Sequence, residues 1–281
     1  MKRLLSELSP LTPTLSRWER ETVLCLLVLL SGCIQSTGGN VVAFEAHASG
    51  DPAIVTGAPL TFTTPRGFDV RLDRAQLTIG ALYLNQQNPQ SYTLEDSCVQ
   101  DGIYSGEVRG GITVDALSAE PQPFPIAGNG TDARTRAAEL WLTGGDLFAD
   151  NDDTVLLDVA GVATRGIESF PFEGQLTIGA NRKIPPRNPA LPGSNPLCRQ
   201  RIVSPIPFDV TLAAGSSVAV IVDPRAWFVS VDFSELTKVS DLPLLYRFIN
   251  DSSSSAQPDR ALYSAMRSSS GPYRLELKEA P

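Results

Sequence analysis

The residues best suited to hold a metal ion lie in one short acidic stretch. Four aspartates and one asparagine fall close together in the chain, at Asp146, Asp150, Asn151, Asp152 and Asp153. Calcium takes several oxygen ligands, which one loop can supply. The spacing differs from the EF-hand loop, which needs a glycine at its sixth position and a glutamate at its twelfth. Aspartate and asparagine also favour solvated turns, so calcium is a candidate cofactor and a metal-free turn is the alternative.

The common catalytic motifs are missing from the sequence. The chain has one histidine, His47, at the end of an expected strand, where a structural role is the ordinary one. HExxH, GxSxG and a glycine-rich phosphate loop are absent. Two carboxylates can hydrolyse a glycosidic bond, but no spacing here selects a pair. We therefore name no catalytic residue. A non-catalytic binding or assembly module is the first hypothesis, and a carboxylate-dependent hydrolase of envelope polysaccharide is the alternative.

The N-terminus reads as a targeting segment. Lys2, Arg3, Arg17 and Arg20 precede an apolar run at 23–30. This run is about half of the ~20 residues that a membrane-spanning helix needs. Basic residues followed by a short apolar core are typical of a signal peptide.

The apolar run ends in Leu30-Ser31-Gly32-Cys33. An aliphatic residue, two small residues and a cysteine in this context resemble the lipobox of bacterial lipoproteins. The resemblance implies that residues 1–32 are removed and that Cys33 becomes a lipidated N-terminus, which anchors the protein to a membrane. An ordinary secretory signal is the alternative. Ile34 and Gln35 stand where some bacterial lipoproteins carry an acidic residue for inner-membrane retention, so the resemblance favours the outer membrane, facing the periplasm or the exterior.

The remaining cysteines form an even pair. Cys25 would leave with the signal peptide and Cys33 would carry lipid, which leaves Cys98 and Cys198. In the oxidising compartments outside the cytosol such a pair is expected to form a disulfide. Two cysteines without further cysteine or histidine ligands do not make a zinc site.

The charge balance excludes some partners. Without residues 1–32, which hold four basic and three acidic side chains, the chain keeps 19 basic and 28 acidic residues and a net charge of −9. Nucleic acids and anionic lipid surfaces need a basic face. Besides the membrane that holds its anchor, we expect a protein or a glycan as partner and no nucleic acid.

Residues 33–40 are expected to be a flexible Ser/Gly tether, and residues 41–281 a single domain. Its clearest strand holds Phe68, Val70 and Leu72 on one face. After Arg74 the apolar positions change to Ala75, Leu77, Ile79, Ala81 and Tyr83. A regular strand would expose one of the two apolar sets. We therefore predict a bulge, bend or tight turn at Asp73-Arg74.

One hexapeptide occurs twice. Residues 76–81 and 175–180 both read QLTIGA, but their flanks differ. We interpret the repeat as two strands in similar environments. Duplicated halves, related by a pseudo-twofold axis, are the alternative.

The last third is again rich in strand patterns. A hairpin is predicted from 218–222 to the alternating residues Trp227, Val229, Val231 and Phe233. A helix is predicted to begin at Pro258-Asp259 and to end at Ala265 or Arg267, followed by a strand at 273–277. Trp141, Trp227 and Phe228 could form a sugar-binding platform if exposed together, whereas singly they suit the core. The sequence thus predicts a mainly β protein, an antiparallel β-sandwich with long loops and one short C-terminal helix.

Overall fold

The structure is a computed structural model that describes residues 39–88, 104–147, 149, 152–181, 200–251 and 255–278. By its internal contacts the chain divides into two units, Met1–Ser36 and Thr37–Pro281. All described residues belong to the second unit. Within them, no helix is long and apolar enough to cross a membrane.

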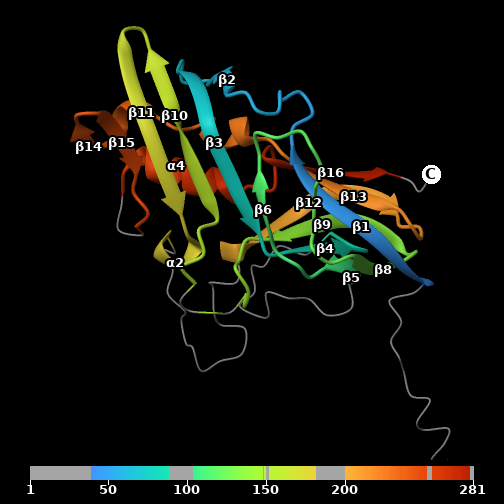
Figure 1. The fold of residues 1–281 in the computed structure, drawn as a ribbon. Helices are drawn as coiled ribbons and strands as arrows, with labels where there is room; N and C mark the ends of the chain where they lie inside the picture. Colours follow the sequence, from blue (N-terminus) through green and yellow to red (C-terminus); the bar gives the residue numbers. More distant parts are fainter. Residues whose placement is uncertain are drawn as a thin grey trace, which may run out of the picture. The chain divides into compact units, whose positions relative to one another are not determined.

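Nine strands form the first sheet (Figure 1). In spatial order they are β12 (Ile202–Thr211), β9 (Arg134–Trp141), β4 (Ala81–Asn85), β5 (Tyr104–Val108), β8 (Gly128–Thr131), β1 (Val41–Gly50), β13 (Ser217–Val222) and β16 (Tyr273–Lys278), with β7 (Gln122–Pro123) paired to β1. The two end strands of this path, β12 and β16, also approach each other.

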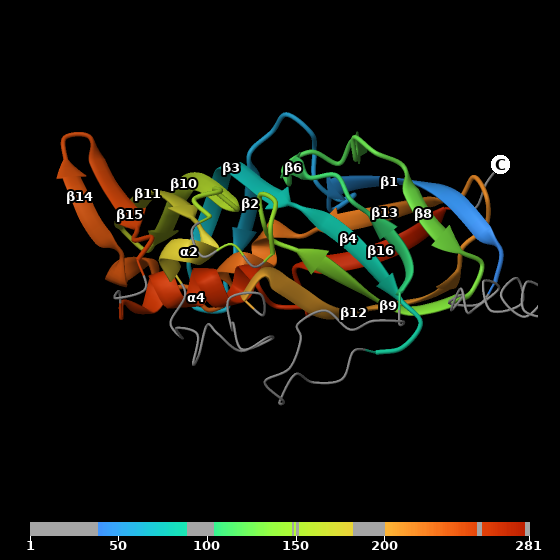
Figure 2. The same cartoon turned by 90° about the horizontal axis from the view of Figure 1, so that it is seen from below.

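Seven strands form the second sheet. In spatial order they are β14 (Thr237–Asp241), β15 (Leu244–Phe248), β11 (Glu168–Leu176), β10 (Leu157–Arg165), β3 (Asp69–Ile79) and β2 (Leu60–Thr63), with β6 (Ile112–Asp115) paired to the far end of β3. The short helices of the described chain are α2 (Ile178–Asn181), η1 (Pro224–Phe228), η2 (Phe233–Glu235) and α4 (Gln257–Met266). Helix α4 lies behind β10 and β11 in Figure 1 and beside them in Figure 2.

The mainly β prediction is confirmed, and so is the late helix, which is α4. The strand directions are less uniform than predicted. Most pairs are antiparallel, but β1 pairs with β13 and β11 with β15 in parallel, so both sheets are mixed. Side chains alternate between the faces of a strand whatever the direction of its neighbour. The sequence pattern therefore carries no information on this point.

One core joins the inner faces of both sheets to η1, η2 and α4. Its centre is aromatic: the ring of Phe172 lies 5.0 Å from that of Phe233 and 5.8 Å from those of Phe228 and Phe248. Trp227 is fully buried in the same core. Trp141 packs elsewhere, with its ring 4.2 Å from that of Tyr83. The three aromatic residues therefore form no shared platform.

The predicted strand at 227–233 is wrong. Pro224–Phe228 is a 3-10 helix, and the Asp223 side chain accepts a hydrogen bond from the Arg225 N–H at its start. Trp227 and Phe228 are both buried although they are neighbours in sequence, which a half-exposed strand does not allow. The alternating pattern was coincidental, because the capping aspartate and the proline at the first helical position decide the local structure.

The predicted irregularity at Asp73-Arg74 is confirmed as a β-bulge. Opposite β3, Ala160 pairs with Arg74 and Gly161 with Leu72, so Asp73 is the extra residue. A Cβ at Gly161 would overlap the carbonyl oxygen of Arg71, so the bulge needs glycine at this position. As a result Asp73 and Arg74 are both exposed, and the apolar residues on either side of them all reach the core.

Candidate functional site

Two rows of side chains cross the outer face of the seven-stranded sheet, perpendicular to its strands. The first row contains one residue from each of four adjacent strands: Arg74 on β3, Ala160 on β10, Glu173 on β11 and Arg247 on β15. The second row runs beside it: Asp115 on β6, Gln76 on β3, Asp158 on β10 and Gln175 on β11. Seven of these eight residues are polar or charged.

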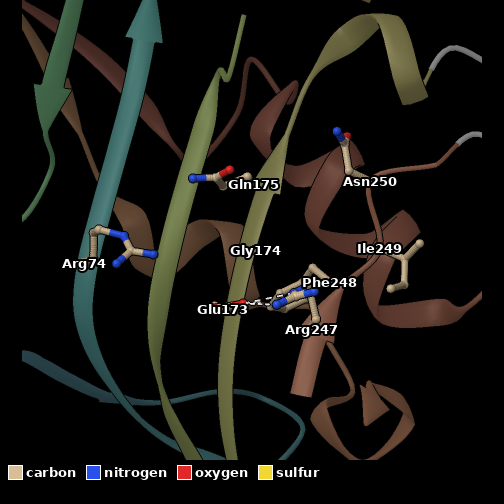
Figure 3. Close-up of a pocket in the computed structure, with 8 residues that line it drawn as sticks. All are labelled: Arg74, Glu173, Gly174, Gln175, Arg247, Phe248, Ile249 and Asn250. Atoms are coloured by element: carbon tan, nitrogen blue, oxygen red, sulfur yellow. Dashed lines mark hydrogen bonds and ion pairs between the residues drawn. The ribbon is translucent and has the colours of Figure 1, made fainter. Parts of the chain in front are cut away.

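A hollow of about 420 Å³ opens over these rows (Figure 3). We call it the first hollow. Arg74 points from β3 toward β10, Glu173 and Gln175 belong to β11, and Arg247 lies next to Glu173. The lining is completed by residues of the β11–β15 pair and the segment after it: Gly174, Phe248, Ile249 and Asn250.

Each arginine of the first row is paired with a carboxylate. Arg74 donates from Nε to Asp158 Oδ1 at 2.9 Å, and Gln175 donates to Asp158 Oδ2 at 3.2 Å. Arg247 donates from Nε to Glu173 Oε1 at 2.9 Å. The charges of these four ionised groups cancel. Both arginines remain exposed, Arg74 to 43% and Arg247 to 49% of their side chains.

The pairs leave hydrogen-bonding atoms free for a ligand. Among the described residues, Nη1 of Arg74, Nη1 of Arg247 and Oε2 of Glu173 make no hydrogen bond within the protein. The groups that carry these atoms are planar and are held in place by the pairing. The first hollow therefore offers fixed donors and acceptors without a net charge.

The predicted calcium stretch has a different arrangement. Arg201, whose side chain is fully buried, donates to the carbonyl oxygens of Asp146 at 2.8 Å, Leu147 at 2.7 Å and Ala149 at 2.7 Å. Its guanidinium also lies 3.7 Å from Asp152 Oδ2. The described residues of this stretch thus bind a cation that is a side chain of the protein itself.

Asp152 is likewise used inside the loop. Its oxygens accept hydrogen bonds from the N–H groups of Thr154 and Gly144 and from the Thr143 hydroxyl. Burial by itself raises the pKa of Asp152, but hydrogen bonds with the Thr154 side chain and with these groups outweigh it and the pKa is lowered. The carboxylate is therefore stabilised in its charged form by the protein itself.

Calcium binding stays a prediction, because Asp150 and Asn151 lie outside the described residues. Asp153 and Asp146 are described, and within the described ranges no three His, Cys, Asp or Glu side chains are grouped as a metal site. A melting temperature that calcium raises and EDTA lowers would support the calcium site.

The other predicted site residues are placed as follows. Cys33, Cys98 and Cys198 lie outside the described residues, so lipidation and the disulfide stay predictions. His47 lies on β1, partly buried, with Nδ1 3.2 Å from the Ser217 hydroxyl. Burial, with a smaller effect of Lys278, lowers the pKa of His47.

The sequence contained two unused signals for the first hollow. The change of apolar positions at Asp73-Arg74 marks the bulge that turns Arg74 outward. The repeated hexapeptide places Gln76 and Gln175 on either side of Asp158, because β3 and β11 both pair with β10. The interpretation as two strands holds only for the first part of the repeat, because Gln175 and Leu176 end β11 whereas Ile178, Gly179 and Ala180 lie in α2. Arg247 had no such signal, since its place depends on the parallel pairing of β11 with β15.

Comparisons with known proteins identify no family. No family model and no curated protein sequence matches the chain. Among solved structures, MbnP from Methylosinus trichosporium aligns with a TM-score of 0.38 and 11% sequence identity, over 85% of this chain and 99% of that chain. A likeness this distant carries no argument about function.

Proposed function

We propose that the protein is a bacterial lipoprotein, tethered to the outer membrane through Cys33, that acts as a non-catalytic binding module of the cell envelope. The lipobox resemblance of Leu30 to Cys33 supports the tether. The binding role rests on one observation, which is the first hollow with its paired and half-exposed arginines. The proposed partner is a polar component of the envelope, a glycan.

Stability alone does not account for these ion pairs. Exposed pairs contribute about 0–1 kcal/mol to folding, and the pairs at Arg74 and Arg247 are exposed on their arginine side. What they do achieve is a fixed orientation of long side chains. A ligand that meets side chains already in place loses less conformational entropy on binding.

The chemistry of the hollow narrows the ligand class. Both arginines are already neutralised by carboxylates, so the hollow lacks the unpaired cation that a phosphate or another strong anion needs. Phe248 is only 1% exposed, so the hollow offers no exposed aromatic ring, and Ile249 is the one aliphatic side chain among its lining residues. Guanidinium, amide and carboxylate groups can each bond neighbouring hydroxyls. These features favour an uncharged, hydroxyl-rich ligand.

A hydrolytic role for the same carboxylates is less well supported. Both oxygens of Asp158 accept hydrogen bonds, and Glu173 Oε1 accepts from Arg247. A glycosidase needs one carboxyl that donates a proton to the leaving group. In this arrangement the carboxylates serve as acceptors, so we expect binding without cleavage.

Co-sedimentation of the whole chain, purified in detergent, with insoluble envelope polysaccharide tests this proposal. We expect the protein to pellet without release of sugar, and Arg247→Ala and Glu173→Ala to weaken retention by about threefold to tenfold each, the effect of one or two lost hydrogen bonds. The matched control is Arg134→Ala, which removes an exposed arginine that is likewise paired with a carboxylate, Asp209, but lies on the nine-stranded sheet. Equal loss with the control, release of sugar, or no retention would overturn the binding role.

The tether is tested separately. Cys33→Ser is expected to move the protein from the membrane fraction to the soluble fraction and to leave retention on the polysaccharide unchanged. A Cys33→Ser protein that stays with the membrane would contradict the lipid anchor.

A further inference from the structure

We infer that the ligand is a linear, uncharged oligosaccharide that lies across the strands and fills two hollows that meet at Arg74. The inference rests on the proposed function and names its ligand class. It begins from a second hollow of about 490 Å³ on the seven-stranded sheet. Arg74 lines both hollows. The rest of the second lining is Gly57, Ala58, Pro59, Asp73, Gln76, Asp115, Leu117 and Ala160.

The two hollows follow the cross-strand rows. The first hollow covers the β11–β15 end of the rows, and the second covers the end with Gln76 and Asp115. From β15 to β6 a ligand would cross β11, β10 and β3, which is four interstrand spacings or about 19 Å. This is several times the width of one sugar ring, so a ligand that uses both hollows must be a chain of several units.

The bulge makes the hollows adjoin. In a regular strand, residues 73 and 74 would point to opposite faces. The extra residue at Asp73 lets both side chains stay on the outer face, where Arg74 lines both hollows. This matches the use of bulges to re-aim a side chain next to a binding site.

Charge selects an uncharged chain. Both cations of the rows are paired, Arg74 with Asp158 and Arg247 with Glu173. Asp73 of the second hollow is paired with Arg71 at 3.1 Å. Asp115 has no cationic partner among the described residues, and its Oδ1 accepts from the Leu117 N–H. The surface is therefore neutral to slightly negative. An acidic polysaccharide would be repelled, while hydroxyl donors would find acceptors at both ends.

The test is a length series of uncharged N-acetylglucosamine oligomers, from one to six units, titrated into the whole chain by calorimetry. We expect affinity to rise with length until both hollows are filled and then to level off. Arg247→Ala should weaken the binding of every oligomer that binds. Gln76→Ala, which changes only the second hollow, should weaken long oligomers by about threefold to tenfold and leave the shortest unchanged.

The control for these variants is Thr61→Ala, an exposed residue on the same sheet that lies outside both hollows, and it should change nothing. Suppose that Arg247→Ala weakens retention on polysaccharide, but that affinity does not depend on oligomer length or that Gln76→Ala has no effect. This result would overturn the inference and leave the proposed function standing. Tighter binding of uronic acid oligomers than of uncharged ones would also overturn it. If the wild-type protein is not retained on the polysaccharide at all, the proposed function itself is wrong.

Discussion

The seven-stranded sheet and the acidic loop use arginine in opposite ways. Arg74 and Arg247 lie on the sheet surface, half-exposed and each paired with one carboxylate. Arg201 is fully buried and donates to three backbone carbonyls of the loop. Charges in contact with water are weakly coupled to stability and remain available to a ligand. A buried guanidinium is fixed by its acceptors, and those acceptors depend on it in turn. The loop looked more like a binding site in sequence, but the sheet has the more accessible chemistry.

The largest expected effect is that of removing the buried guanidinium. Arg201→Met leaves the carbonyls of Asp146, Leu147 and Ala149 without their donor. We expect a loss of about 3–5 kcal/mol in the free energy of unfolding, and a melting temperature lower by on the order of 10 °C, measured by circular dichroism. Arg201→Lys keeps the charge but not the forked donors, so its free energy of unfolding should lie between those of the wild type and Arg201→Met. If Arg201→Met loses less than about 1 kcal/mol, the buried arginine contributes no more to stability than an exposed ion pair does.

A substitution opposite the β-bulge should lower both the stability of the protein and its retention on polysaccharide. Gly161→Ala adds a Cβ that would overlap the Arg71 carbonyl opposite the bulge. Forcing a close-packed strand apart costs about 1–3 kcal/mol, and we expect Arg74 to shift and polysaccharide retention to fall as well. Gly145→Ala is the matched control, because nothing lies within 4 Å of the Cβ it would add. Loss of stability with unchanged retention would separate the bulge from the site.

More of the fold than of the candidate site could be predicted from the sequence. Alternation around Phe68 to Ile79 is a local property, so it gave the strand and even the bulge at Asp73. The direction of β1 beside β13 and of β11 beside β15 is set by distant segments. At 224–228 the apolar alternation predicts a strand, but the Asp223 cap and Pro224 start a 3-10 helix there.

The site was harder because it exists only across strands. Arg74, Asp158, Glu173 and Arg247 are far apart in sequence and come together through strand register. The acidic loop was easy to see because its residues are adjacent in the chain. Its partner Arg201 could not be recognised from the sequence, since the contact joins residues more than 50 positions apart.

Removing the exposed Glu173–Arg247 ion pair is expected to have a smaller effect on the free energy of unfolding. Glu173→Ala and Arg247→Ala should each change the free energy of unfolding by less than about 1 kcal/mol, measured by urea denaturation, while both weaken retention. The double variant gives the coupling energy of the pair. A coupling well above 1 kcal/mol would mean that this pair stabilises the fold, and it would weaken the contrast with Arg201.

The smallest effect concerns His47, a partly buried group between these two extremes. Its Nδ1 lies 3.2 Å from the Ser217 hydroxyl on β13, and burial first, then Lys278, lowers its pKa below 6.5, while Glu45 acts in the opposite direction. The unfolded chain therefore takes up this proton more readily than the folded one, so stability is fully present above pH 6.5 and falls as the pH drops through that value. Comparing the wild type with His47→Gln by urea denaturation between pH 7.5 and 5.5 isolates this contribution, because the carboxylates titrate in both proteins. We expect the wild type to lose more stability than the variant over this range. An equal loss would mean that the burial of His47 does not couple its proton to folding.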